Sequence, residues 1–139
     1  RSTMRLLLTY VEEHYAEKLA LEDLADYAQY NRTYISTLFK QMVGINFHEY
    51  LTRVRFQHAL NDLTYTRDNL TDIALKNGFP DLKTLTARFR STFQRTPTQY
   101  RAALKPDEVL YDKVRQFLDP QDMVLRKKLG EYAKTGIIK

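Results

Sequence analysis

The chain carries two groups of polar, basic and small apolar side chains whose types suit contacts with a nucleic acid. Hydroxyl and ammonium groups bond to base edges, methyl groups contact thymine, and Lys or Arg contact phosphates. We expect base-edge contacts from Thr33, Ser36 and Thr37 in the first group, and from Leu82, Lys83, Thr86 and Ala87 in the second. We expect phosphate contacts from Arg32, Lys40 and Arg90.

Each group lies on the second helix of a predicted helix-turn-helix unit. In the first unit a short helix over 21–29 precedes a turn, and Asn31 is expected to cap a helix over 32–43. In the second, a short helix over 71–77 stops at Gly78, and Asp81 is expected to cap a helix over 82–93. The spacing predicts that the apolar side chains of these second helices point inward, namely Ile35, Leu38, Phe39 and Met42, then Leu85, Phe89 and Phe93.

The remaining pattern predicts an all-α protein. An amphipathic helix opens the chain over 3–16, and a long helix over 47–63, capped by Asn46, joins the two units. Pro97 suits the first position of a last short helix that runs through residue 103. The predicted organisation is a first subdomain (1–50), a linker helix (51–64), a second subdomain (65–104), and an extension (105–139) with two additional helices of unknown role.

Composition excludes several classes of function. With 43% hydrophobic residues the chain can build a core, and without cysteine it has no disulfide or thiolate metal site. Its three histidines form no i, i+4 pair, and the chain has no nucleophile elbow and no phosphate-binding glycine loop. We therefore expect no enzyme activity, no metal and no cofactor. Without a long apolar run or a signal peptide, we expect a cytoplasmic protein that does not bind a membrane.

The net charge of +5 is unevenly distributed. Residues 1–50 hold five Lys or Arg against seven Asp or Glu, whereas residues 51–105 hold ten against four. Residues 106–139 hold seven against six. The positive charge therefore lies mainly on the linker helix and the second unit, among hydroxyl and amide side chains, as a phosphate-binding surface requires.

The second unit resembles the DNA-binding domain of the AraC/XylS family of bacterial transcription regulators. The resemblance rests on Ile73-Ala74, Gly78-Phe79, Leu85, Phe89-Arg90, Phe93 and Thr96-Pro97-Thr98-Gln99-Tyr100-Arg101. The first unit adds Leu24-Ala25, Tyr34-Ile35, Leu38-Phe39-Lys40, Gly44, Tyr50-Leu51, Arg55 and Ala59. The sequence departs from the family at Gln94, where Gly is usual, at Leu85, where Phe is usual, and at Ala87, where Arg is frequent.

The resemblance implies a transcription regulator that binds double-stranded promoter DNA. The second helix of each unit would enter the major groove, about one DNA turn (~34 Å) from the other. In the family such a protein often recruits RNA polymerase, and an effector-binding domain, which this chain does not contain, usually precedes the DNA-binding one. The short side chains of the first unit favour phosphate contacts and DNA shape over direct base contacts there. The alternative is a helical module of the same fold that binds protein instead of DNA.

Overall fold

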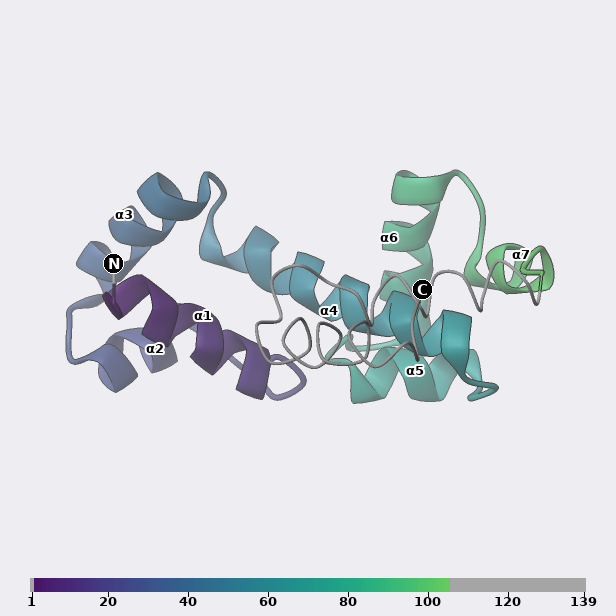
Figure 1. Ribbon diagram of the computed structural model, residues 1–139, viewed down its shortest axis with the longest axis horizontal. Coiled ribbons are helices and arrows are strands. Elements are labelled where there is room, and N and C mark those ends of the chain that lie inside the picture. Colours follow the sequence, from purple (N-terminus) through teal and green to yellow (C-terminus); the bar gives the residue numbers. More distant parts are fainter. Residues whose placement is uncertain (1, 106–139) are drawn as a thin grey trace, which may run out of the picture. The chain divides into compact units, whose positions relative to one another are not determined.

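The computed structural model describes residues 2–105, which form seven helices and no strand. Figure 1 shows that α4 is the longest of them and lies between the helices of the two predicted units. The helices are α1 (Ser2–His14), α2 (Leu21–Ala28), α3 (Arg32–Val43), α4 (Phe47–Tyr65), α5 (Leu70–Lys76), α6 (Leu82–Phe93) and α7 (Pro97–Ala102). The prediction of an all-α fold is confirmed over these residues, and Arg1–Tyr100 group into one compact unit. The two helices predicted after residue 105 lie outside the described residues.

Local capping explains why the predicted starts of α3, α4 and α6 are confirmed. The side chain of Asn31 accepts a hydrogen bond from the amide of Tyr34, at 2.8 Å, at the start of α3. Asn46 caps α4 in the same way. Asp81 accepts from the amide of Thr84, at 2.7 Å, at the start of α6. Each cap satisfies a backbone donor that has no partner within its helix, so a few neighbouring residues determine where the helix begins.

Two hydrophobic cores lie along α4. The first contains Leu7, Ile35 and Phe39 together with Leu51 from the first half of α4. The second contains Ile73, Leu85 and Phe89 together with Ala59 and Leu63 from the second half of α4. α3 and α6, the two predicted recognition helices, therefore each bury one face against a separate core, and they are joined to each other through α4.

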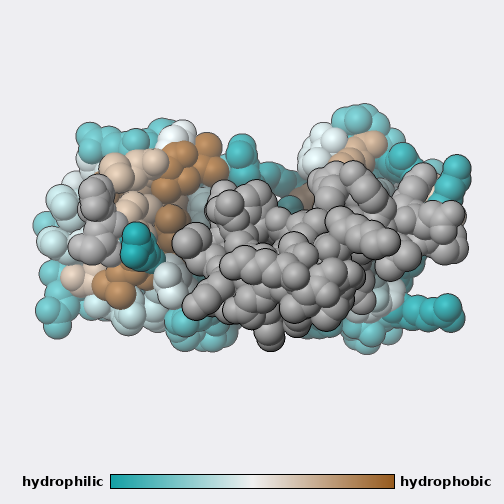
Figure 2. Space-filling model, in the orientation of Figure 1, coloured by the Kyte–Doolittle hydropathy of each residue, from teal (hydrophilic) through white to brown (hydrophobic). Residues whose placement is uncertain are grey.

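Some predicted details are wrong. Met42 was expected in the first core, but it is 53% exposed: it lies on the same side of α3 as the buried Ile35, but in the last turn of the helix, where the core does not cover it. The long helix continues two residues past Leu63 to Tyr65, and α7 ends at Ala102. Figure 2 shows hydrophobic side chains reaching the surface over the part of the molecule that contains α1 and α3, where Leu6 and Met42 are exposed.

Polar contacts connect the first half to α4 at the end of α1. The Arg55 side chain donates from Nε to the carbonyl oxygen of Tyr15 at 2.7 Å, and from Nη2 to that of Glu17 at 2.8 Å. Gly78 lies against the same place with a φ of +91°, and a Cβ there would lie 2.5 Å from Arg55 Nε and 2.8 Å from the Tyr15 oxygen. Glycine is therefore required at this position for its backbone conformation and for space.

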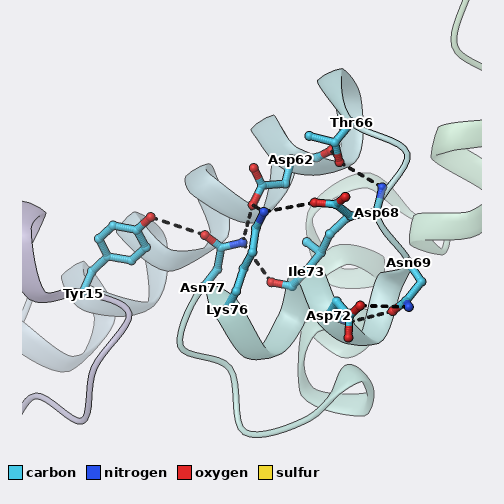
Figure 3. Close-up of polar contacts among 9 residues, drawn as sticks. All are labelled: Tyr15, Asp62, Thr66, Asp68, Asn69, Asp72, Ile73, Lys76 and Asn77. Atoms are coloured by element: carbon cyan, nitrogen blue, oxygen red, sulfur yellow. Dashed lines mark hydrogen bonds and ion pairs between the residues drawn. The ribbon is translucent and has the colours of Figure 1, made fainter.

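Asn77 is a buried polar residue at the end of α5 that links three segments. Figure 3 shows its amide between Tyr15, Asp62 and the backbone of Ile73. The amide nitrogen donates to Asp62 and to the Ile73 carbonyl, both at 2.8 Å, and the amide oxygen faces the Tyr15 hydroxyl at 3.4 Å. Because its polar atoms have partners, Asn77 can be buried without the penalty of an unsatisfied group.

Candidate nucleic-acid interface

The exposed face of α3 contains most of the predicted contacts of the first unit. Thr33, Ser36, Thr37 and Lys40 are all exposed, as predicted. They recur at spacings of three and four residues, so they lie on one side of the helix. Ile35 and Phe39, fully buried in the first core, fix this orientation. The structure therefore places hydroxyl groups and one ammonium group together on a solvent-facing surface.

Arg32, at the start of α3, is also exposed but has a partner on the neighbouring helix. Its Nε lies 2.8 Å from a carboxylate oxygen of Glu22 in α2. Both side chains are more than half exposed, so the pair contributes little to stability and can exchange for another anion. A phosphate contact by Arg32 therefore requires that it release Glu22, which the sequence did not indicate.

The corresponding face of α6 exposes part of the predicted set fully. Lys83, Ala87 and Arg90 are exposed, and their spacing places them on one side of the helix. Thr86 is half-buried at the edge of this face. Leu82 is half-buried and packs against the second core, so only part of its side chain is open to a contact with a base edge, which stays a prediction.

The cap of α6 is a polar structure close to this face. One carboxylate oxygen of Asp81 accepts from both the amide and the hydroxyl of Thr84, each at 2.7 Å. The hydrogen bond from the Thr84 hydroxyl is the largest cause of a lowered pKa of Asp81, and the hydrogen bond from the Thr84 amide and the nearby charge of Lys83 lower that pKa further. Thr84 is exposed, but its hydroxyl is used within the cap, which leaves Lys83 as the polar group of the first turn that faces solvent.

Sequence reasoning missed two features of the recognition helices. Gln41 is exposed on α3 one turn after Thr37, and its amide could bond to an adenine edge. The i, i+4 spacing from Thr37 was a usable signal for it. Arg88 on α6 lies beside the predicted contacts but bonds to Glu49 at the start of α4, 39 residues away. No local pattern indicated that pairing.

Other kinds of site receive no support from the described residues. Residues 2–105 contain no cluster of His, Asp or Glu side chains that could bind a metal ion. None of the helices within that range is both long and apolar enough to cross a bilayer.

Comparison with known proteins supports the same interpretation. The family described as "Helix-turn-helix domain" matches residues 24–103. The chain is 39% identical over 92 residues to an uncharacterised HTH-type transcriptional regulator of Staphylococcus aureus (strain COL), a match covering 66% of this chain and 12% of that protein. The chain thus spans about an eighth of the length of the curated relatives that it matches first.

Solved structures agree with the fold. One is the C-terminal domain of the two-component response regulator yesN from Fusobacterium nucleatum, 30% identical, with a TM-score of 0.68 over 73% of this chain and 99% of that one. Another is the DNA-binding domain of AdpA, described as a global transcriptional factor, in complex with a target DNA. It is 25% identical, with a TM-score of 0.67 over 71% of this chain and 89% of that one. This chain therefore belongs to the AraC-type helix-turn-helix family, whose members are transcription regulators rather than enzymes.

Proposed function

We propose that the chain is the DNA-binding part of a transcription regulator and binds two successive major-groove segments of a promoter. The observation that carries the proposal is the matched exposure of two polar helix faces, with Thr33, Thr37 and Lys40 on α3, and Lys83 and Arg90 on α6. Each face belongs to a capped helix that is oriented by its own buried core. This is the arrangement by which helix-turn-helix proteins present side chains to base edges.

The two faces should contribute differently. The second half carries more positive charge, and Lys83 and Arg90 face solvent and form no ion pair with another residue in the range 2–105. In the first half, the acidic α2 provides Glu22 as a competing partner for Arg32, and the remaining exposed groups are mostly short hydroxyl side chains. We therefore propose that α6 supplies most of the base-specific contacts, while α3 adds phosphate contacts and a dependence on DNA shape.

The comparisons support a role at promoters. AdpA, a protein of similar fold, is described in complex with its target DNA, and the Staphylococcus aureus relative is named a transcriptional regulator. We extend this to a cytoplasmic protein that recruits RNA polymerase and whose effector-binding domain lies elsewhere in a longer protein. The proposed division into subdomains 1–50 and 65–104, joined by the 51–64 linker, follows the two cores and α4.

The first test is selection from a pool of random DNA duplexes, performed with the full chain at two salt concentrations. We expect a motif with two sequence blocks about 10 bp apart and an affinity that falls steeply with salt. A single block would assign specific recognition to one helix alone. Absence of both enrichment and salt-dependent binding would contradict DNA binding and favour the protein-interaction module.

A substitution on α6 then tests the role of a named side chain. We expect Lys83→Ala to weaken binding to the selected duplex by roughly 1–3 kcal/mol and to relax sequence preference at one position, because an ammonium that bonds to a base edge distinguishes bases. Lys18→Ala is the matched control, since it removes the same charge from an exposed position between α1 and α2. Equal losses on selected and random duplexes would show that Lys83 contacts phosphate only.

A further inference from the structure

The relative placement of the two recognition helices depends on few contacts. Each helix packs into a different hydrophobic core, and the two cores share only α4. A helix is joined firmly to its own core, but two cores on one long helix can rotate relative to each other as that helix bends. Side-chain contacts that connect the halves directly must therefore limit this movement.

One such contact joins α6 to the start of α4. The carboxylate of Glu49 accepts two hydrogen bonds from the guanidinium of Arg88, at 2.6 Å from Nη2 and at 3.3 Å from Nη1. The same carboxylate accepts from Nε of Arg53, one turn further along α4, at 2.8 Å. A guanidinium bonded through two nitrogens has a defined direction as well as a distance, so this pair restricts orientation.

The position of Glu49 makes the contact informative about α3. Glu49 lies in the first turn of α4, where its amide is capped by Asn46. Only three residues, from Gly44 to Asn46, separate the end of α3 from the start of α4. A short path therefore runs from one recognition helix, through this connection and the Glu49–Arg88 pair, to the other recognition helix.

Arg88 itself is not on the predicted DNA-facing side of α6. With about 100° between successive residues, Lys83, Ala87 and Arg90 cluster within a narrow sector, and Arg88 lies roughly 100° beyond Ala87. Its side chain is 29% exposed and already bonded to Glu49. Arg88 can therefore restrain α6 without occupying the surface that would meet the bases.

We propose that the Glu49–Arg88 pair is a positioning contact that sets the distance and angle between α3 and α6, and so determines which spacing between two half-sites the protein accepts. The part of this proposal that concerns half-site spacing rests on the proposed function, because it requires that the chain bind DNA. Its structural part, a restraint between the two helices, can be measured without DNA.

The structural part is tested by a distance measurement in the free protein. Because the chain has no cysteine, Thr37→Cys and Lys83→Cys introduce the only two sites for spin labels, one on each recognition helix. We expect Glu49→Gln to widen or shift the distribution of distances between the labels, as measured by pulsed electron spin resonance. Arg53→Gln is the matched control, because Arg53 pairs with Glu49 within α4 and does not connect the halves. An unchanged distribution in Glu49→Gln would overturn the proposal.

The functional part is tested on duplexes that carry the selected half-sites one base pair closer together or further apart. The unsubstituted protein should prefer one spacing, and we expect Glu49→Gln and Arg88→Gln to reduce that preference by roughly twofold to fivefold, as for the loss of one partly exposed ion pair. Glu49→Arg combined with Arg88→Glu should recover part of it. An unchanged spacing preference with weaker binding at every spacing would instead make Arg88 a phosphate contact and overturn the positioning role.

The two tests also separate this proposal from the proposed function. If no duplex is bound specifically but the label distances respond to Glu49→Gln, the restraint is real and DNA binding is the part that fails. If a motif is selected but neither distance nor spacing responds, DNA binding stands and the positioning role fails.

Discussion

The two recognition helices have C-terminal caps of the same geometry, but the capping residue is glycine in α3 and glutamine in α6. This difference allows a prediction about the stability of the protein. Gly44 caps the C-terminal end of α3 and Gln94 caps that of α6, and each of these residues has a left-handed backbone, with φ of 89° and 57° respectively. Each also donates its amide proton to the carbonyl four residues earlier, of Lys40 at 2.9 Å and of Arg90 at 2.8 Å. The same cap is thus built once with glycine and once with a residue that has a Cβ.

We expect Gln94→Gly to raise the free energy of unfolding by about 0.5–1 kcal/mol. The left-handed conformation costs a residue with a Cβ about 1–2 kcal/mol. Glycine offsets roughly 0.5–1 kcal/mol of that gain, because it has more backbone freedom to lose on folding. The Gln94 side chain contributes little in return, since its contact with the Ser91 carbonyl is 3.4 Å long and exposed.

The assay is urea and thermal unfolding followed by circular dichroism. The expected gain corresponds to a melting temperature about 2–8 °C higher for a domain of this size. Gly44→Ala is the control of opposite sign, because a Cβ at Gly44 meets nothing within 4 Å and any loss is then purely conformational. A melting temperature that falls for Gln94→Gly would refute the reasoning, because it would mean that the Gln94 side chain stabilises more than its backbone costs.

Two further predictions concern the core of the second half and the ion pair at α4. We expect Phe89→Ala to lower the free energy of unfolding by urea by about 3–5 kcal/mol, since Phe89 is 1% exposed and contacts Phe56 and Tyr100. Met42→Ala is the control: it removes an exposed side chain and should change the free energy of unfolding by no more than about 0.5 kcal/mol. Similar losses in both variants would contradict the assigned helix orientations. The hydrogen bonds from Arg88 and Arg53 lower the pKa of Glu49 from 4.5 to about 2, so its contribution to stability should be fully present above about pH 4.5 and disappear as the pH falls towards 2. The stability difference between the unsubstituted protein and Glu49→Gln should shrink across that range, and a constant difference would contradict the ion pair.

Much of the fold could be predicted because its signals are local. Asn31, Asn46 and Asp81 each cap a helix through a residue three positions away, and the bounds of α3 and α6 agree with the predicted ranges. The apolar spacing placed Ile35 and Phe89 in the cores for the same reason, since the helical period fixes which residues share a face.

The candidate site was predictable only in part. Exposure of Thr37 and Lys83 follows from helix phase alone, because these residues lie opposite the apolar face. Leu82 was placed on the DNA-facing surface, but the second core covers much of it, and the width of a buried face depends on how neighbouring helices pack. Met42 shows the opposite case: it shares a side of α3 with the buried Ile35, but it is exposed because the core does not extend over the last turn of the helix.

The sequence by itself thus determined the order of the helices, the capped starts of α3, α4 and α6, and the family to which the chain belongs, because hydrogen-bonding caps and the apolar period act over three or four residues. Only the tertiary structure decided how the two recognition helices are connected. The pair of Glu49 with Arg88, the bonds of Arg55 to the end of α1 and the burial of Asn77 against Asp62 join residues 15 to 40 positions apart. Those pairings depend on the path of α4 between two cores, and side chains so far apart in sequence carry no local pattern that identifies their partners.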